Sequence, residues 1–160
     1  MLSELAASVR SGTVSPVELV EESLRRIDAA EHLNAVVLGR GEEARAEAGR
    51  HPRTGPLAGL PLLVKDMARC RGSRTTMGTH LLADAPADDV DDDVVARLRG
   101  AGAIVVGRTN SPAFGHAPFT TNLVFGPTLN PWNPTRSPGG SSGGRAGGRP
   151  ARRAPRAPRP

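Results

Sequence analysis

The chain has 160 residues, of which 38% are hydrophobic and only four are aromatic. Its formal net charge of +5 would ordinarily suggest a nucleic-acid or anionic-membrane partner, but six of its 21 basic residues lie in residues 145–160, which contain no acid. The preceding residues hold 15 basic and 16 acidic side chains, which excludes a strongly basic body. The length suits one domain with a mostly aliphatic core.

The first 30 residues predict two helices. One covers about residues 3–10 and ends near Gly12. The second begins with a capping box at Ser15 to Glu18, has proline at its first helical position, and extends to about Ala30. Apolar residues recur in it at three- and four-residue spacing, so one face should pack on a core: Val17, Leu19, Val20, Leu24 and Ile27.

Strands and helices then alternate along the chain. Residues 34–38 predict a strand, 42–50 a polar helix, 60–64 a buried strand and 103–107 another buried strand. Before the last strand, Asp91 to Asp93 mark the start of a helix whose apolar face holds Val94, Val95 and Leu98. This order predicts an α/β fold, a mixed sheet flanked by helices with at least some parallel pairing. The strand at 60–64 ends at Lys65-Asp66, where apolar burial should finish.

After Asn110 the composition changes to Gly, Pro, Asn, Ser and Thr, which is typical of long functional loops. This segment ends in Gly-Gly-Ser-Ser-Gly-Gly at 139–144. Residues 145–160 consist of six Arg, four Ala, four Pro and two Gly, all of which have GC-rich codons. We expect residues 1–144 to form part of a domain and the tail to be disordered, the product of a shifted reading frame.

Four segments, taken in order and spacing, resemble the amidase signature family. They cover most of residues 15–144, and only their joint occurrence is specific. They are Gly55 to Pro61 with Val64-Lys65-Asp66, Arg97 to Asn110, Gly126 to Pro134, and Ser137 to Gly144.

The resemblance implies hydrolysis or transfer of amide groups by a Ser-Ser-Lys triad, without metal or cofactor. By position in the motifs, Lys65 matches the catalytic lysine and Ser141 the bridging serine, which the family places at a cis peptide bond. These residue types suit the chemistry on their own terms. A lysine becomes a base near neutral pH when burial disfavours its ammonium form, and a hydroxyl beside it can relay a proton.

Each motif also has an ordinary structural explanation. A lone Val-Lys-Asp is usually a solvated strand end, and a lone Gly-Gly-Ser-Ser-Gly-Gly is usually a flexible linker. The acids at 88–93 favour a solvated loop and helix cap over a cation site, and the scattered histidines and single Cys70 predict no metal.

The family's nucleophilic serine belongs to a second glycine-rich segment, about two dozen residues after the bridging serine, and these 160 residues do not contain it. The oxyanion hole belongs to the same segment. We therefore expect an N-terminal part of the family's fold with no amidase activity of its own. Two non-catalytic alternatives are nucleic-acid binding through the basic tail and binding of an amide ligand near Lys65 and Ser141.

Other expectations concern location and partners. The single cysteine, and a start without a signal peptide's apolar run, favour the cytoplasm, and no apolar stretch is long enough for a membrane helix. The resemblance implies a small-molecule amide substrate in intact relatives. The sequence identifies neither that amide nor the oligomeric state.

Overall fold

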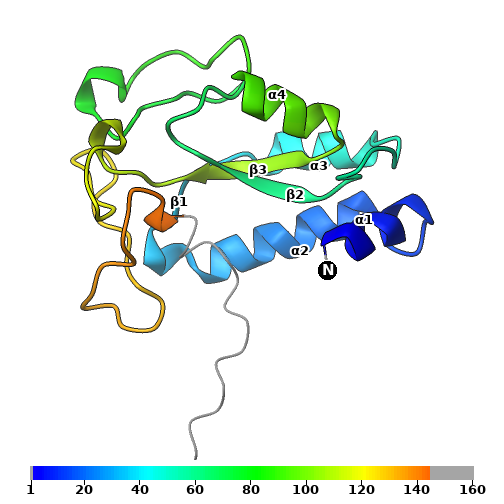
Figure 1. The fold of residues 1–160 in the computed structure, drawn as a ribbon, viewed down its shortest axis with the longest axis horizontal. Helices are drawn as coiled ribbons and strands as arrows, with labels where there is room; N and C mark the ends of the chain where they lie inside the picture. Colours follow the sequence, from blue (N-terminus) through cyan, green and yellow to red (C-terminus); the bar gives the residue numbers. More distant parts are fainter. Residues whose placement is uncertain (1, 145–160) are drawn as a thin grey trace, which may run out of the picture.

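The computed structural model describes residues 2–144, and the predictions made for the tail therefore lie outside the described residues. Helices and strands alternate along the chain (Figure 1). In chain order the elements are α1 (Leu2–Arg10), α2 (Pro16–Ala29), the 3-10 turn Glu31–Leu33, β1 (Val36–Gly39), α3 (Gly41–Gly49), β2 (Pro61–Lys65), the 3-10 turn His80–Leu82, α4 (Asp93–Gly100), β3 (Ile104–Thr109) and the 3-10 turn Ala113–Gly115.

The sheet has three strands in the order β1-β3-β2. β2 is parallel to β3 and β1 is antiparallel to it, which confirms the predicted mixed sheet. Every residue of the central strand β3 is buried. Leu62 pairs with Val105 but Leu63 pairs with Gly107, so Val106 is an extra residue that forms a bulge in β3.

Helices cover both faces of this sheet. Val20 and Leu24 of α2 and Ala44 of α3 pack against Ile104 and Val106, so α2 and α3 share one face. On the other face, Val95 of α4 joins the cluster of Val64, Cys70, Val95 and Val105. The alternation of β3 side chains between these clusters explains why an unbroken apolar run forms this strand.

Local sequence patterns predicted the positions of the helices closely. Ser15 and Glu18 form the predicted capping box, with Ser15 Oγ accepting from the Glu18 amide and Glu18 Oε2 from the Ser15 amide. Two predicted core residues were wrong: Val17 is 40% exposed and Val94 58% exposed. Val17 lies in the first turn of α2, between the buried Pro16 and Val20, and Val94 lies about 100° around α4 from the buried Val95.

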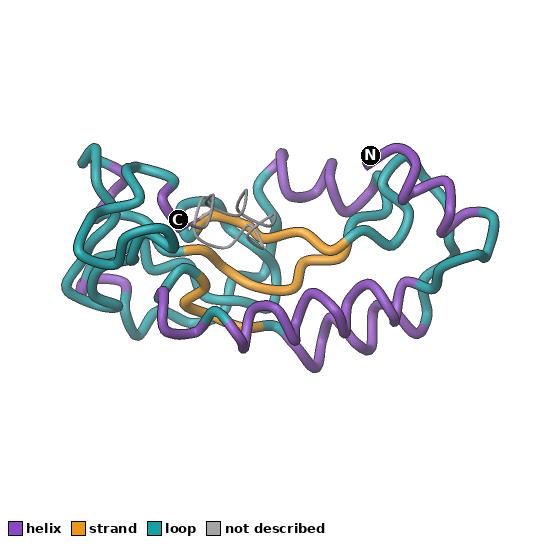
Figure 2. The backbone as a smooth tube through the Cα atoms, turned by 90° about the horizontal axis from the view of Figure 1, so that it is seen from below, coloured by secondary structure: helices purple, strands orange, loops and turns teal. Residues whose placement is uncertain are grey.

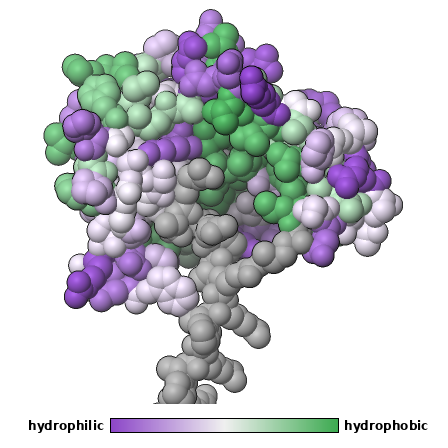
Figure 3. All heavy atoms as spheres, viewed as in Figure 1, coloured by the Kyte–Doolittle hydropathy of each residue, from purple (hydrophilic) through white to green (hydrophobic). Residues whose placement is uncertain are grey.

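The long loops gather at one end of the strands. Seen from below, these loops lie opposite the end at which α1 begins (Figure 2). The edge strand β2 is less covered than β3, because Pro61, Leu62 and Leu63 are only half-buried. Hydrophobic residues accordingly gather near the centre of the face seen in Figure 3. Among the described helices, none has the length and apolar character needed to cross a membrane.

Candidate active site

The two residues singled out from the sequence meet at the loop end of the sheet. Lys65 is the last residue of β2, beside Thr109 of β3, and Ser141 lies in the glycine-rich loop. Lys65 Nζ lies 2.8 Å from Ser141 Oγ and donates a hydrogen bond to it. The structure therefore brings together, from 76 positions apart in the chain, the amine and hydroxyl that the motifs paired only by resemblance.

The loop that carries Ser141 depends on its glycines. A Cβ at Gly140 would lie 2.7 Å from the Phe119 amide nitrogen, and one at Gly144 would lie 2.6 Å from the nitrogen and oxygen of Asn110. Gly139 has a φ of +87°, which glycine adopts readily. The Gly140–Ser141 peptide bond is cis. These close backbone contacts fit a packed loop and not a flexible linker.

Asparagine and threonine side chains attach the preceding loop to the sheet. Asn122 Nδ2 donates to Asn110 Oδ1 and to the carbonyl of Ser111, while its Oδ1 accepts from the amides of Val124 and Phe125. Asn110 Nδ2 in turn donates to Thr128 Oγ1 and to the Gly126 carbonyl. The Thr-Asn segments of the sequence thus act as buried links between backbone strands and loops.

Asp66 is fully buried, which corrects the expectation that burial ends at Lys65-Asp66. Its Oδ1 lies 3.4 Å from Nη2 of the equally buried Arg108, and its carboxylate also accepts from the hydroxyl and amide of Thr76. Burial raises the pKa of Asp66 above its ordinary value, outweighing the hydrogen bonds from Thr76 and the charge of Arg108, which lower it. This network adjoins the backbone of Lys65, because Arg108 Nη2 also lies 3.5 Å from the Lys65 carbonyl oxygen and 2.7 Å from that of Ala68.

The acidic segment at 88–92 holds the loop that follows Lys65. Asp88 Oδ2 accepts from the amide of Cys70, Asp91 Oδ1 from that of Arg71, and Asp92 Oδ2 from that of Arg69. Asp92 does not cap α4 with its side chain, so the predicted cap interaction is absent there. Among the described residues, no group of three or more His, Cys, Asp or Glu is placed to hold a metal ion.

The lysine and arginine content of the chain bears on this site. Of the 21 lysine and arginine residues in the sequence, 20 are arginine, and the single lysine is Lys65. Arginine stays protonated at any ordinary pH, whereas lysine can lose its proton when buried. Lys65, the one of these 21 side chains that is not an arginine, contacts Ser141.

The comparisons with known proteins identify the family of the chain. The family model described as Amidase matches residues 18–147, which is most of the chain. The chain belongs to the amidase signature family. A curated relative, a glutamyl-tRNA(Gln) amidotransferase subunit from Burkholderia mallei, is 43% identical over 162 residues, covering 98% of this chain but 32% of its own length.

Solved amidase signature structures share the fold. A bacterial aryl acylamidase is 38% identical with a TM-score of 0.84, over 91% of this chain and 32% of its own. A 6-aminohexanoate cyclic dimer hydrolase is 37% identical with a TM-score of 0.82, over 89% of this chain and 30% of its own. The chain thus spans about a third of the length of the relatives it matches, and the predicted partial α/β fold of the family is confirmed.

Sequence reasoning assigned no role to three buried residues of this end of the molecule. Asp66 and Arg108 lay within the family segments without a role, and Thr120 belonged to no motif. A buried Arg-Asp pair leaves no local pattern, because its partners lie 42 residues apart. A hollow of about 320 Å³ between segments 119–121 and 127–137 is lined by neither Lys65 nor Ser141.

Proposed function

We propose that this chain supplies the lysine and the bridging serine of an amide hydrolase that cleaves a carboxamide C–N bond. Lys65, in its neutral form, takes a proton from Ser141, and Ser141 takes one from the nucleophilic serine. The same relay in reverse delivers a proton to the leaving nitrogen. The substrate is a small amide, and we place the protein in the cytoplasm from its sequence.

One observation carries this proposal: the 2.8 Å contact between Lys65 Nζ and Ser141 Oγ. This distance is that of a direct hydrogen bond, so a proton can pass without an intervening water. The family membership of the chain and the use of its only lysine at this point support the same conclusion.

The 160 residues contain no second glycine-rich serine segment after Ser142. In this proposal the nucleophile and the oxyanion hole come from that segment, as the family resemblance implies. We therefore expect the 160 residues alone to hydrolyse no amide above background, because most of the catalytic groups are missing. Calorimetry with simple carboxamides would test whether the pair still binds an amide without turning it over.

A chimaera tests the role of the pair directly. Residues 1–144 replace the matching third of the bacterial aryl acylamidase, which is 38% identical and shares the fold. We expect the chimaera to hydrolyse a chromogenic anilide, and Ser141→Ala and Lys65→Met to abolish this activity. Lys65→Arg is the sharper variant, because it keeps the positive charge and removes the base.

The activity of Lys65→Arg distinguishes proton transfer by Lys65 from a simple need for positive charge. Loss of activity in a variant with unchanged thermal stability fits proton transfer by Lys65. Retained activity would mean that only a positive charge is needed at this position, and the proposed mechanism would be wrong.

A further inference from the structure

Ser141 is held in place by a side chain outside its own loop. The Thr120 hydroxyl lies 3.0 Å from the Gly139 carbonyl oxygen, to which it donates, and 3.0 Å from the Gly143 amide nitrogen, from which it accepts. These two atoms lie on either side of Ser141 in the chain. One hydroxyl therefore closes the loop that presents Ser141, using both its donor and an acceptor position.

The contact is close as well as hydrogen-bonded. A Cβ at Gly143 would lie only 2.3 Å from Thr120 Oγ1, so Gly143 packs directly on this oxygen. On the other side of Ser141, a Cβ at Gly140 would lie 2.8 Å from the Phe119 carbonyl carbon. Residues 119–120 thus form the surface on which the serine loop rests.

Thr120 itself has little freedom to move. It is 2% exposed, and its carbonyl accepts a hydrogen bond of 3.0 Å from the Thr128 amide. Its β-branched side chain has few accessible rotamers. Its neighbour Thr121, by contrast, is exposed. The position of Ser141 therefore depends, through Thr120, on the loop whose Asn122 is hydrogen-bonded to Asn110 and Ser111 at the end of β3.

From these contacts we infer that Thr120 is a positioning residue for Ser141, whose hydroxyl keeps Oγ within hydrogen-bonding distance of Lys65. This inference rests on the role proposed above for Ser141. Thr120 takes no part in proton transfer. Its removal should change the rate of the chemical step and leave substrate binding largely unchanged.

Two variants and one matched control separate positioning from simple stability. Thr120→Val keeps the shape and removes both hydrogen bonds, whereas Thr120→Ser keeps the hydroxyl. Thr128→Val is the control: it also removes a buried hydroxyl, which donates to the Asn34 carbonyl and accepts from Asn110, but Thr128 has no hydrogen bond to the loop at 139–143. Both valine variants should lose similar stability, because each leaves buried polar groups unpaired.

The first readout uses the full 160-residue chain and does not require activity. With a single lysine, protein labelled with ¹⁵N at lysine Nζ gives one side-chain lysine signal, that of Lys65. Ser141→Ala defines the signal of Lys65 in the absence of the Ser141 hydroxyl. Thr120→Val should move the signal toward that of Ser141→Ala, while Thr120→Ser and Thr128→Val should keep the wild-type position.

The second readout is kinetic and uses the chimaera described above. Thr120→Val should lower kcat about tenfold or more with KM within about twofold, because small misplacements of a reacting group cost rate steeply. Thr120→Ser should restore kcat, and Thr128→Val should change it much less. A Thr120→Val enzyme whose kcat and lysine signal both match those of Thr128→Val would overturn the inference. Activity surviving Lys65→Arg would instead overturn the proposed function, so the two failures are distinguishable.

Discussion

Residues 2–109 and residues 110–144 are held together in different ways. Outside the loop at 66–92, the first region is layered, with valine, leucine, isoleucine and alanine packed between helices and sheet. The second is a set of loops held by asparagine and threonine hydrogen bonds and by glycines in close backbone contact. Apolar packing tolerates exchange among residues of similar volume, whereas a hydrogen-bonded loop without room for a Cβ does not.

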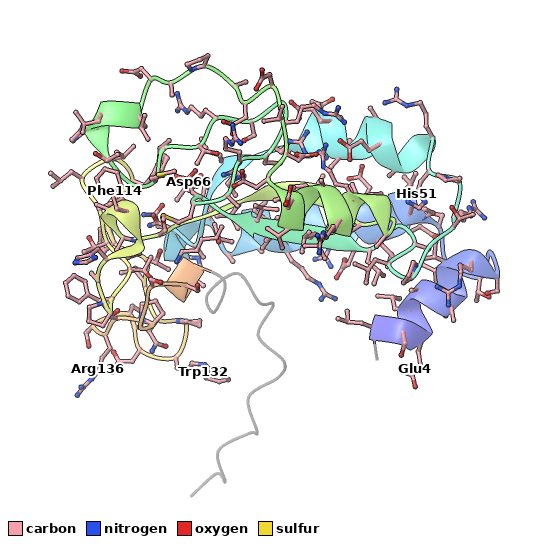
Figure 4. The ribbon with its side chains drawn as sticks, turned by 45° about the horizontal axis from the view of Figure 1, so that its top comes forward. Glu4, His51, Asp66, Phe114, Trp132 and Arg136 are labelled. Atoms are coloured by element: carbon pink, nitrogen blue, oxygen red, sulfur yellow. The ribbon has the colours of Figure 1, made fainter. Side chains whose placement is uncertain are left out.

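The candidate site lies where the two regions meet. Lys65 belongs to the layered region and Ser141 to the loops. Asp66 is visible at the loop end of the sheet in Figure 4, while Phe114, Trp132 and Arg136 lie on the loops beyond it. The distance between Lys65 Nζ and Ser141 Oγ therefore depends on the structure of both regions. Mutations in the layered region and in the loops should alter this distance by different routes.

The largest effect is expected from Ile104→Ala. Ile104 is 1% exposed and packs at the centre of the α2–α3 face, so its truncation should lower the free energy of unfolding by about 3 kcal/mol. Urea denaturation followed by circular dichroism measures this. Because the loops are attached to the end of β3, amide hydrogen exchange should accelerate in both regions. Unchanged exchange in residues 110–144 would show that the loops do not depend on the sheet.

Gly144→Ala should disturb the loops and spare the layers. Its Cβ would lie 2.6 Å from backbone atoms of Asn110, and such overpacking costs roughly 1–3 kcal/mol. We expect faster amide exchange in residues 110–144 with little change in α2 and α3. The control is Gly49→Ala, whose Cβ would meet no atom within 4 Å and should leave stability unchanged or slightly higher. Equal effects at the two positions would argue against the close-contact explanation.

Asp66→Asn tests the boundary between the regions through the pH dependence of stability. Burial raises the pKa of Asp66 in the folded state. The contribution of this raised pKa to the stability of the fold is therefore present in full below the unfolded pKa, near 3.8, and is lost as pH rises through the raised value. Relative to wild type, the asparagine variant should therefore lack a fall in stability that begins at about pH 4. Urea titrations of both proteins across this range measure the difference. Parallel pH profiles would mean that Arg108 fully offsets the burial.

The smallest effect is expected from Arg45→Ala on the surface of the layers. Arg45 Nε lies 2.7 Å from Glu21 Oε1 and so connects α3 to α2, but both side chains are nearly half exposed. Water and salt screen such pairs. The variant should differ from wild type only slightly at low ionic strength and not at all in high salt. A salt-independent loss of stability would indicate that the packing of the arginine stem matters more than its charge.

The layered region was predicted better than the loops because its signals are local. Periodicity and a capping box located α2, and the apolar runs located β2 and β3 to within two residues. The errors at Val17 and Val94 arose because a repeat shows which face is apolar but not where its packing partner ends. The parallel pairing followed from the alternation of strands and helices.

The site was predicted in part. Lys65 and Ser141 were found through motifs, and their contact is observed, while their catalytic roles stay predictions. Thr120, Asp66 and Arg108 were missed because their contacts join residues 10 to 42 positions apart in the chain, which no local pattern encodes. Buried charges and hydroxyls at a loop end look the same in sequence as solvated ones.

The bulge in β3 has a consequence for charge. Beyond Val106 the one-to-one pairing of β2 with β3 resumes. Arg108 therefore pairs with Val64 and lies on the same face of the sheet, whereas Lys65 pairs with Thr109 and lies on the opposite face. If the same sequence paired one to one from Pro61 and Ile104 onward, with no bulge, Arg108 would pair with Lys65 and their side chains would lie on the same side. The bulge thus determines which face of the sheet the later side chains of β3 occupy, and it keeps a permanent cation off the lysine's side.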